Sequence, residues 1–290
     1  MVAGVSNLDP QAARLVQQIT PEVLQWIVEQ ARAGHKPEAV LQAMRVSGWS
    51  DDVASAAIEW SRRGQGIPPP APVLVPDPDP TDSRWVLSTS DREVRVLASM
   101  RLPRAMVFGD LLSQEECDGI IQLAHGRLER STTVDSWSGG SALHEGRSSE
   151  GTFFDRGANP LVARIEARIA ALINWPVDRG EGLQVLRYGP GAEYRPHHDY
   201  CDPTVPGAPA VLERGGQRVA TVVMYLNDPL KGGGTTFPDV GFQVAPMKGN
   251  AVFFSYDRPH AMTKTLHGGA PVIEGEKWVA TKWLRERTFV

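Results

Sequence analysis

The chain has 290 residues, 41% of them hydrophobic and 22% charged, which is enough for one full catalytic core and a small additional module. A formal net charge of −4 and an isoelectric point near 6.0 argue against nucleic acid or an anionic membrane surface as a partner. The first residues lack the basic and apolar regions of a signal peptide, and no run approaches the roughly 18 apolar residues of a membrane span. The two cysteines, Cys117 and Cys201, are too few for a disulfide framework, so we expect a cytoplasmic protein.

Residues 1–64 predict a small all-α module. Asp9-Pro10 and Thr20-Pro21 each place a capping side chain before a proline at the first helical position, and Ser50 precedes another helix start. Apolar residues then recur at helical spacing: Val23, Leu24, Ile27, Val28, Val40, Leu41, Met44, Val53, Ala56, Ala57 and Trp60. Such stripes form the core of a helical bundle, and we interpret the module as an interaction domain for a protein partner.

Residues 65–83 separate this module from the rest of the chain. Their prolines are too dense for a helix or a sheet and favour an extended polyproline II linker. We therefore place a second, larger domain at residues 84–290.

The larger domain predicts helices first and strands after them. A capping box at Ser113 and Glu116 indicates one helix, and Asn159-Pro160 begins a second. From Gly182 onward the chain alternates short apolar runs with turn residues, as strands do. This order indicates an α+β domain.

A metal site is predicted by three polar residues in the strand-rich part. Side chains alternate faces along a strand, so His197 and Asp199 point to one side and His198 to the other. With His267 they supply two imidazoles and one carboxylate, the facial triad of non-haem Fe(II) oxygenases. Lys277 follows in another alternating run and adds a cation.

From about Leu111 to Trp283 the chain resembles the prolyl 4-hydroxylase family of 2-oxoglutarate- and Fe(II)-dependent dioxygenases. The resemblance rests on several long motifs in the family's order: Glu181-Gly-Leu-Gln-Val-Leu-Arg-Tyr188, Tyr194-Arg-Pro-His197-His-Asp199-Tyr, Gly215-Gly-Gln-Arg218, Met224-Tyr-Leu, Gly233-Gly-Thr-Thr236-Phe-Pro, His267-Gly-Gly-Ala-Pro and Lys277-Trp-Val-Ala-Thr-Lys-Trp283. It implies a double-stranded β-helix, or jelly-roll, with flanking helices. It also implies Fe(II), 2-oxoglutarate and O₂ as cofactor and co-substrates, with ascorbate supporting activity.

The resemblance also assigns roles around the co-substrate. Lys277 would bind the distal carboxylate of 2-oxoglutarate, Tyr188 and Thr236 would add hydroxyl groups, and Trp283 would wall the pocket. Lys282 falls on the opposite face of the same strand, where we expect a solvated surface charge.

For the substrate, the resemblance points to Tyr194, Arg218, Arg147 and Glu181 as contacts with a proline-containing peptide or protein segment. The family frequently has histidine where this chain has Arg285, and a fixed cation there would favour acidic substrates.

Two other functions stay open at this point. The chain could hydroxylate a free amino acid or another small molecule, or it could be a non-catalytic binding protein on an oxygenase scaffold. Arg218 could also be structural and pair with an acid at the sheet edge such as Glu213. The intact triad with Lys277 argues against a non-catalytic scaffold, and the helical module favours a macromolecular substrate.

Overall fold

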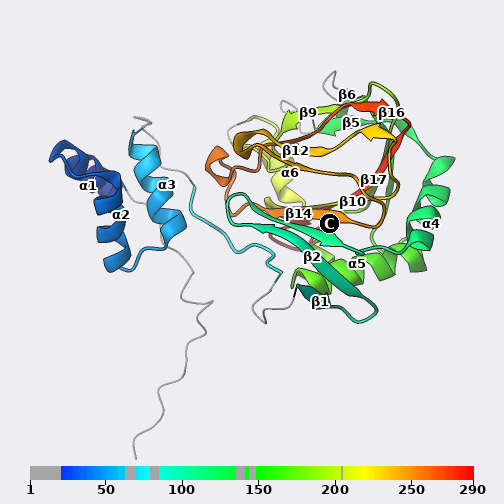
Figure 1. The fold of residues 1–290 in the computed structure, drawn as a ribbon, viewed down its shortest axis with the longest axis horizontal. Coiled ribbons are helices and arrows are strands. Elements are labelled where there is room, and N and C mark those ends of the chain that lie inside the picture. The colour runs from blue at the N-terminus through cyan, green and yellow to red at the C-terminus, as the bar shows by residue number, and fades with distance from the viewer. Residues whose placement is uncertain (1–20, 63–69, 79–84, 135–140, 144–147, 204) are drawn as a thin grey trace, which may run out of the picture. The chain divides into compact units, whose positions relative to one another are not determined.

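The computed structural model describes residues 21–62, 70–78, 85–134, 141–143, 148–203 and 205–290. The chain divides into two compact units, Met1–Leu74 and Val75–Val290 (Figure 1). No helix within the described ranges is both long and apolar enough to cross a membrane. The predicted substrate residue Arg147 and the predicted helix start at Asp9-Pro10 lie outside the described residues.

Three helices form the first unit: α1 (Pro21–Arg32), α2 (Pro37–Val46) and α3 (Asp51–Arg62). α1 and α3 begin where the capping and proline signals predict, since α1 opens on Pro21 and α3 follows Ser50. α2 opens on Pro37 after Lys36, whose side chain makes no capping hydrogen bond, and the predicted signals did not include this start. Their apolar stripes meet in one core: Ile27, Val40, Met44, Val53, Ala54, Ala57 and Ile58. The helical periodicity in the sequence therefore corresponds to real packing.

The end of the predicted linker packs against the larger unit. Val75 is buried in the core of that unit, and the backbone N–H of Asp77 donates to the carbonyl oxygen of Ile173 at 3.1 Å. The Asp77 carboxylate also pairs with Arg104 at 2.6 Å. The larger unit begins at Val75 rather than at residue 84, because the Val75 side chain packs in the core of that unit.

Two antiparallel sheets build the larger unit. The nine-stranded sheet has the order β1 (Val86–Ser88), β2 (Glu93–Met100), β3 (Arg104–Gly109), β14 (Ala251–Ser255), β10 (Arg218–Tyr225), β17 (Lys277–Arg285), β8 (Leu183–Tyr188), β7 (Glu150–Phe154) and β4 (Glu129–Arg130). The four-stranded sheet has the order β13 (Phe242–Val244), β12 (Thr235–Phe237), β15 (His267–Gly269) and β9 (Tyr194–His197). Two further pairs join β11 (Lys231–Gly232) to β16 (Val272–Glu274), and β5 (Thr132–Val134) to β6 (Ser141–Leu143).

Helices cover the outer face of the nine-stranded sheet. In Figure 1, α5 (Pro160–Leu172) lies on the side of this sheet away from β12, and α4 (Gln114–His125) lies beside it. The predicted capping box is present, with Ser113 and Glu116 each bonded to the other's backbone N–H. A short helix, α6 (Ala208–Glu213), interrupts the strand-rich part that the sequence predicts as strands and turns.

The two faces of β17 belong to two different cores. Trp278, Ala280 and Leu284 pack with the helices in the outer core, where Cys117 is also buried. Lys277, Val279, Thr281 and Trp283 face the other way and line a cavity. This arrangement of a helix-covered large sheet and a smaller opposing sheet confirms the predicted jelly-roll with flanking helices.

The prediction of a solvated Lys282 is wrong. Its side chain lies on the predicted face but is only 2% exposed, and its ammonium pairs with Glu166 of α5 and donates to the carbonyl oxygen of Glu181. The helix α5 covers this face of β17. Both faces of the strand are therefore buried, and alternate side chains point to α5 or to the cavity rather than to the interior or to solvent.

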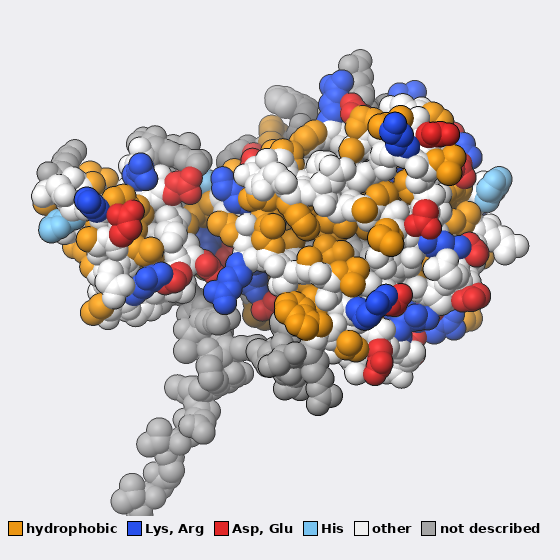
Figure 2. Space-filling model, in the orientation of Figure 1, with side chains coloured by type: hydrophobic (Ala, Val, Ile, Leu, Met, Phe, Trp, Pro, Cys, Tyr) orange, Lys and Arg blue, Asp and Glu red, His pale blue; other side chains and the backbone are white. Residues whose placement is uncertain are grey.

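Charges of both signs are mixed on the surface. On the face in Figure 2, lysine and arginine side chains of the larger unit lie among aspartate and glutamate side chains. Among the described residues, Arg95 pairs with Asp110 and Lys248 with Asp118, both at 2.6 Å.

Candidate metal and co-substrate site

The structure brings the three predicted metal ligands together. His197 ends β9 and His267 begins β15, and the two are direct partners in the antiparallel pairing of these strands. Asp199 follows β9, with its carboxylate oxygens 3.4 Å from Nε2 of His197 and 3.5 Å from Nε2 of His267. One potential ligand atom from each residue lies within 4.8 Å of the others. The neighbouring His198 is outside this group and stacks on Tyr200, as the alternation predicts.

Hydrogen bonds to backbone carbonyl oxygens fix the orientation of the two imidazole rings. Nδ1 of His197 lies 2.9 Å from the carbonyl oxygen of Arg195, and Nδ1 of His267 lies 2.9 Å from that of Thr265. A proton on each Nδ1 donates to its carbonyl, which leaves the lone pair of Nε2 directed toward the carboxylate of Asp199. This is the usual arrangement of metal-ligating histidines, whose other nitrogen is held by a backbone or carboxylate acceptor.

The protonation states suit a metal. Burial lowers the pKa of His267 to about 4, so this ring is neutral at neutral pH, as a ligand must be. Burial would raise the pKa of Asp199, but His267 and His197 beside it hold the pKa well below its ordinary value. Two imidazoles and one carboxylate leave further coordination positions open, which fits Fe(II) in an oxygenase.

Two hydroxyl groups orient the aspartate from behind. The hydroxyl of Thr221 on β10 donates to Oδ2 of Asp199 at 2.7 Å and lies 3.0 Å from the hydroxyl of Tyr256. Both side chains are buried. No sequence motif pointed to Thr221, although this residue has the same inward phase on β10 as Val223 and Tyr225.

The triad opens into a cavity between the two sheets. Besides the three ligands, its walls are Leu186, Tyr188, Tyr194, Val223, Thr235, Gly268, Gly269, Lys277, Val279, Thr281 and Trp283. Three of the four residues predicted to hold 2-oxoglutarate, Lys277, Tyr188 and Trp283, are therefore in one cavity with the triad.

Lys277 is a buried cation without an acidic partner. Its side chain is 4% exposed, and no carboxylate of the described residues lies within ion-pair distance of its ammonium. The rings of Tyr188 and Tyr225 flank it, with centroids 5.5 and 5.8 Å from Nζ. Burial lowers the pKa of Lys277 to about 8. A buried charge of this kind is expected to meet an anionic ligand, because desolvation is otherwise uncompensated.

The predicted threonine is displaced by one residue. Thr235 lines the cavity, whereas the hydroxyl of Thr236 donates to the carbonyl oxygen of Gly268 at 3.3 Å and its side chain is not part of the cavity wall. The hydroxyl of Tyr225 donates to that of Thr235 at 2.8 Å. Adjacent residues of a strand face opposite sides, so the inward position on β12 belongs to Thr235.

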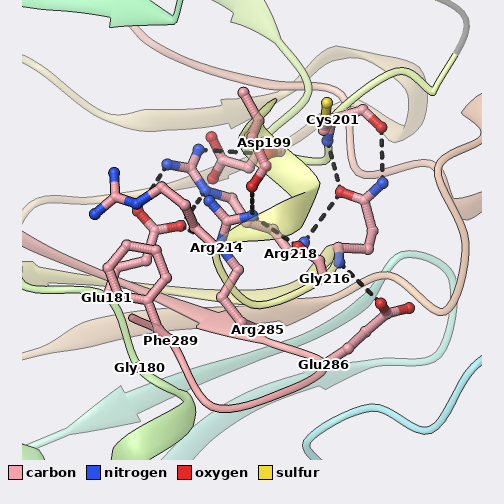
Figure 3. Close-up of polar contacts among 12 residues, drawn as sticks. Gly180, Glu181, Asp199, Cys201, Arg214, Gly216, Arg218, Arg285, Glu286 and Phe289 are labelled. Carbon is pink, nitrogen blue, oxygen red and sulfur yellow. Dashed lines mark hydrogen bonds and ion pairs between the residues drawn. The ribbon is translucent and has the colours of Figure 1, made fainter. Parts of the chain in front are cut away.

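The predicted substrate residues fall into two places. Tyr194 lines the cavity, and its ring stacks on His197 with centroids 3.7 Å apart. Glu181 and Arg218 instead pair with each other at 2.6 Å, and the guanidinium of Arg218 lies 4.1 Å from the ring centroid of Trp283. The suggested pairing of Arg218 with Glu213 is wrong, since the partner of Arg218 is Glu181 (Figure 3).

Arg285 is not a free cation beside the substrate. Its side chain is buried, and it donates to Glu181 at 2.7 Å and to the carbonyl oxygen of Gly216 at 2.8 Å (Figure 3). Burial would raise the pKa of Glu181, but the guanidinium groups of Arg218 and Arg285 hold it below its ordinary value. The premise that Arg285 stands as a free cation beside the substrate is therefore wrong, because its side chain is buried and shares the Glu181 carboxylate with Arg218.

Comparison with known proteins agrees with this geometry. The family described as the 2OG-Fe(II) oxygenase superfamily matches residues 183–285. The chain is 40% identical over 207 residues to probable prolyl 4-hydroxylase 7 of Arabidopsis thaliana, covering 64% of each protein. It is 40% identical over 210 residues to probable prolyl 4-hydroxylase 4 of the same plant, covering 64% of this chain and 69% of that protein. The match thus spans less than two thirds of the first relative.

A solved structure is also similar. The viral collagen prolyl hydroxylase of Paramecium Bursaria Chlorella virus-1, in its 2-oxoglutarate complex, has 30% sequence identity and a TM-score of 0.48, covering 62% of this chain and 95% of that one. The sequence relationship to the plant proteins, together with the triad and cavity, confirms the predicted family. This chain belongs to the prolyl 4-hydroxylase family of 2-oxoglutarate- and Fe(II)-dependent dioxygenases.

Proposed function

We propose that this protein hydroxylates prolines in a peptide or protein segment, with 2-oxoglutarate and O₂ as co-substrates and succinate and CO₂ as by-products. The observation that carries the proposal is the placement of a two-histidine, one-aspartate triad and an uncompensated buried lysine in the walls of one cavity. The relatives named as prolyl 4-hydroxylases support proline as the target.

His197, Asp199 and His267 would hold Fe(II), which when bound supplies the activation of O₂ that allows an unreactive C–H bond to be hydroxylated. The protein's part is to keep the His267 imidazole neutral, to orient the carboxylate through Thr221, and to enclose the reaction in a largely apolar cavity. Because Asp199 occupies the carboxylate position, hydroxylation is favoured over halogenation, for which related enzymes lack this ligand.

Lys277 would bind the distal carboxylate of 2-oxoglutarate, an anion that would compensate its buried charge. Tyr188 and Thr235 line the same cavity and offer hydroxyl groups to that carboxylate, with Thr235 in the role that the resemblance gives to Thr236. Trp283 would form the wall between this co-substrate and the Arg218–Glu181 pair, on whose guanidinium its ring packs.

On the substrate side, Tyr194 is the predicted contact nearest the triad, because its ring stacks on the ligand His197. Arg218 and Glu181 lie behind Trp283, and we propose that they act on the substrate through their effect on this wall as well as by direct contact.

The test is an anaerobic reconstitution with Fe(II), 2-oxoglutarate and ascorbate, followed by exposure to oxygen with proline-containing peptides. Succinate together with a peptide mass increase of about 16 Da, one oxygen atom, is expected. Free proline and other amino acids serve as the alternative substrates. Succinate with a modified amino acid and no modified peptide would favour the small-molecule hydroxylase. Absence of both succinate and a hydroxylated product would favour a non-catalytic binding protein.

The helical unit would choose the protein partner. Its surface has an apolar cavity lined by Val23, Trp26, Met44, Ser47 and Trp49, which supports an interaction role. A chain shortened to residues 75–290 should keep its rate on a short peptide and lose rate on a full-length protein substrate. An unchanged rate on both substrates would contradict this role.

A further inference from the structure

The metal ligand Asp199 is carried by a part of the chain that is outside the sheets. The strand β9 ends at His197, so Asp199 and Cys201 have no ladder of backbone hydrogen bonds to hold them. Metal affinity depends on how well the ligands are held in place before the ion binds. Thr221 holds the Asp199 carboxylate, and Arg218 donates to the carbonyl oxygen of Asp199 at 3.4 Å. The backbone beyond Asp199 needs a further contact.

One side-chain amide provides that contact. Oε1 of Gln217 accepts from the backbone N–H of Cys201, and Nε2 of Gln217 donates to the carbonyl oxygen of Cys201, both at 2.7 Å. Figure 3 shows both hydrogen bonds at Cys201. Gln217 thus replaces the backbone partner that a neighbouring strand would give, two residues after the carboxylate ligand.

Gln217 is itself rigidly held. It is buried, and its Oε1 also accepts from the backbone N–H of Arg218 at 3.0 Å. Its own backbone N–H donates to the Glu286 carboxylate at 2.8 Å (Figure 3), and its carbonyl oxygen accepts from the N–H of Glu286 at 3.0 Å. The segment with Asp199 is tied in this way to the start of β10 and to the residue that follows β17.

A second amide does the same for the co-substrate lysine. Nδ2 of Asn227 donates to the carbonyl oxygen of Glu276 at 2.8 Å, and Oδ1 of Asn227 accepts from the backbone N–H of Trp278 at 2.6 Å. These two residues flank Lys277, at the point where β17 begins. Neither Asn227 nor Gln217 lines the cavity.

We propose that Gln217 and Asn227 are positioning residues with separate tasks: Gln217 holds the segment of Asp199 for the metal, and Asn227 holds Lys277 for the anionic co-substrate. The proposal rests on the proposed function, because it assigns residues to that site. Each side-chain amide accepts from a backbone N–H and donates to a backbone carbonyl oxygen. Replacing it with an apolar side chain of similar size therefore removes both hydrogen bonds and still fills the same space.

The first arm of the test uses Gln217→Met in the full chain. Anaerobic titration with Fe(II) should show a dissociation constant about tenfold higher than that of the natural chain. This is the lower end of the loss in metal affinity that is usual when a residue holding a metal ligand in place is substituted. Hydrogen exchange of the Cys201 amide in the metal-free protein should be faster. The dissociation constant for 2-oxoglutarate at saturating Fe(II) should change by less than about twofold, since Lys277 is untouched.

The second arm uses Asn227→Leu and should give the reverse result. The dissociation constant for 2-oxoglutarate, measured anaerobically at saturating Fe(II), should rise about tenfold because the ammonium of Lys277 is less well placed. The affinity for Fe(II) and the exchange of the Cys201 amide should stay unchanged.

Asn250→Ala is the matched control, because it removes another amide acceptor, for the backbone N–H of Asp110. It should change neither dissociation constant. If Gln217→Met and Asn227→Leu only lower the melting temperature, or alter both constants alike, the assignment of separate positioning tasks is overturned. Failure of the natural chain to bind Fe(II) at all would instead contradict the proposed function.

Discussion

Lys277 and Tyr188 face each other as direct partners in the antiparallel pairing of β17 and β8, and the lysine ammonium lies 5.5 Å from the centroid of the tyrosine ring. A ring face offers a cation only weak compensation compared with a carboxylate. The cation is therefore held in a site that becomes electrostatically complete only when an anion enters the cavity.

Co-substrate affinity should fall with rising pH. Burial lowers the pKa of Lys277 to about 8, so the free enzyme loses this charge as the pH passes that value, while 2-oxoglutarate keeps both negative charges. Its dissociation constant from the Fe(II)-loaded protein should thus be constant below about pH 7 and rise several-fold by about pH 9. Anaerobic titrations across this range measure it. A Lys277→Arg chain, whose cation does not titrate there, should show a flatter profile, and equal slopes for both would contradict this role of Lys277.

Removing the buried charge should stabilise the protein without co-substrate. The folded state lowers the pKa of Lys277 below its ordinary value, so the charged lysine costs stability at pH values below about 8 and this cost fades as the pH rises toward 10.5. Lys277→Met should raise the free energy of unfolding at neutral pH by about 1–3 kcal/mol, measured by urea denaturation. Added 2-oxoglutarate should stabilise the natural chain but not the variant. Destabilisation by Lys277→Met would show that the ammonium has a compensating partner.

Loss of a metal ligand should abolish turnover by loss of iron. His197→Ala, Asp199→Ala and His267→Ala each remove one of the three ligands, and none should retain Fe(II) after gel filtration, as measured by metal analysis. The matched control is His198→Ala, because His198 stacks on Tyr200 outside the triad and should leave the iron content unchanged. Full activity of His267→Ala would show that the triad is wrongly assigned.

The two adjacent threonines of β12 should differ in their effect on the co-substrate. Thr235→Val removes a hydroxyl from the cavity wall and should raise the KM for 2-oxoglutarate by about three- to tenfold, the value of one hydrogen bond. Thr236→Val removes a hydroxyl that donates to the carbonyl oxygen of Gly268 and should leave this KM within about twofold. A larger effect of Thr236→Val would restore the assignment that the family resemblance alone gives.

The buried carboxylate of Glu181 should be essential for stability. Glu181→Gln removes the one carboxylate that, among the described residues, lies within ion-pair distance of the guanidinium groups of Arg218 and Arg285. It should lower the free energy of unfolding by about 3 kcal/mol or more. Glu193→Gln is the exposed control, since its carboxylate is 3.7 Å from Arg195 and 40% exposed, and it should cost less than about 1 kcal/mol. Urea denaturation measures both. An equally small effect for Glu181→Gln would indicate that this residue serves the substrate rather than the fold.

Local patterns were sufficient to predict much of the site. The alternation of a strand placed His197 and Asp199 on one side and His198 on the other, and it placed Lys282 on the face of β17 opposite Lys277. These features depend only on the geometry of neighbouring residues, which is why the sequence determined them. Capping side chains and prolines likewise determined the starts of α1, α3, α4 and α5, because those signals act within one turn.

Tertiary structure decided what each face meets and which distant groups pair. Lys282 is buried because α5 covers its face, and Thr235 rather than Thr236 faces the cavity because of the position that β12 takes between its neighbours. The compensation of Arg285 by Glu181 joins residues 104 positions apart. The alternation of side chains along a strand shows only which residues share a face. Whether that face contacts solvent, a helix or a cavity depends on how elements remote in sequence pack together when the chain folds.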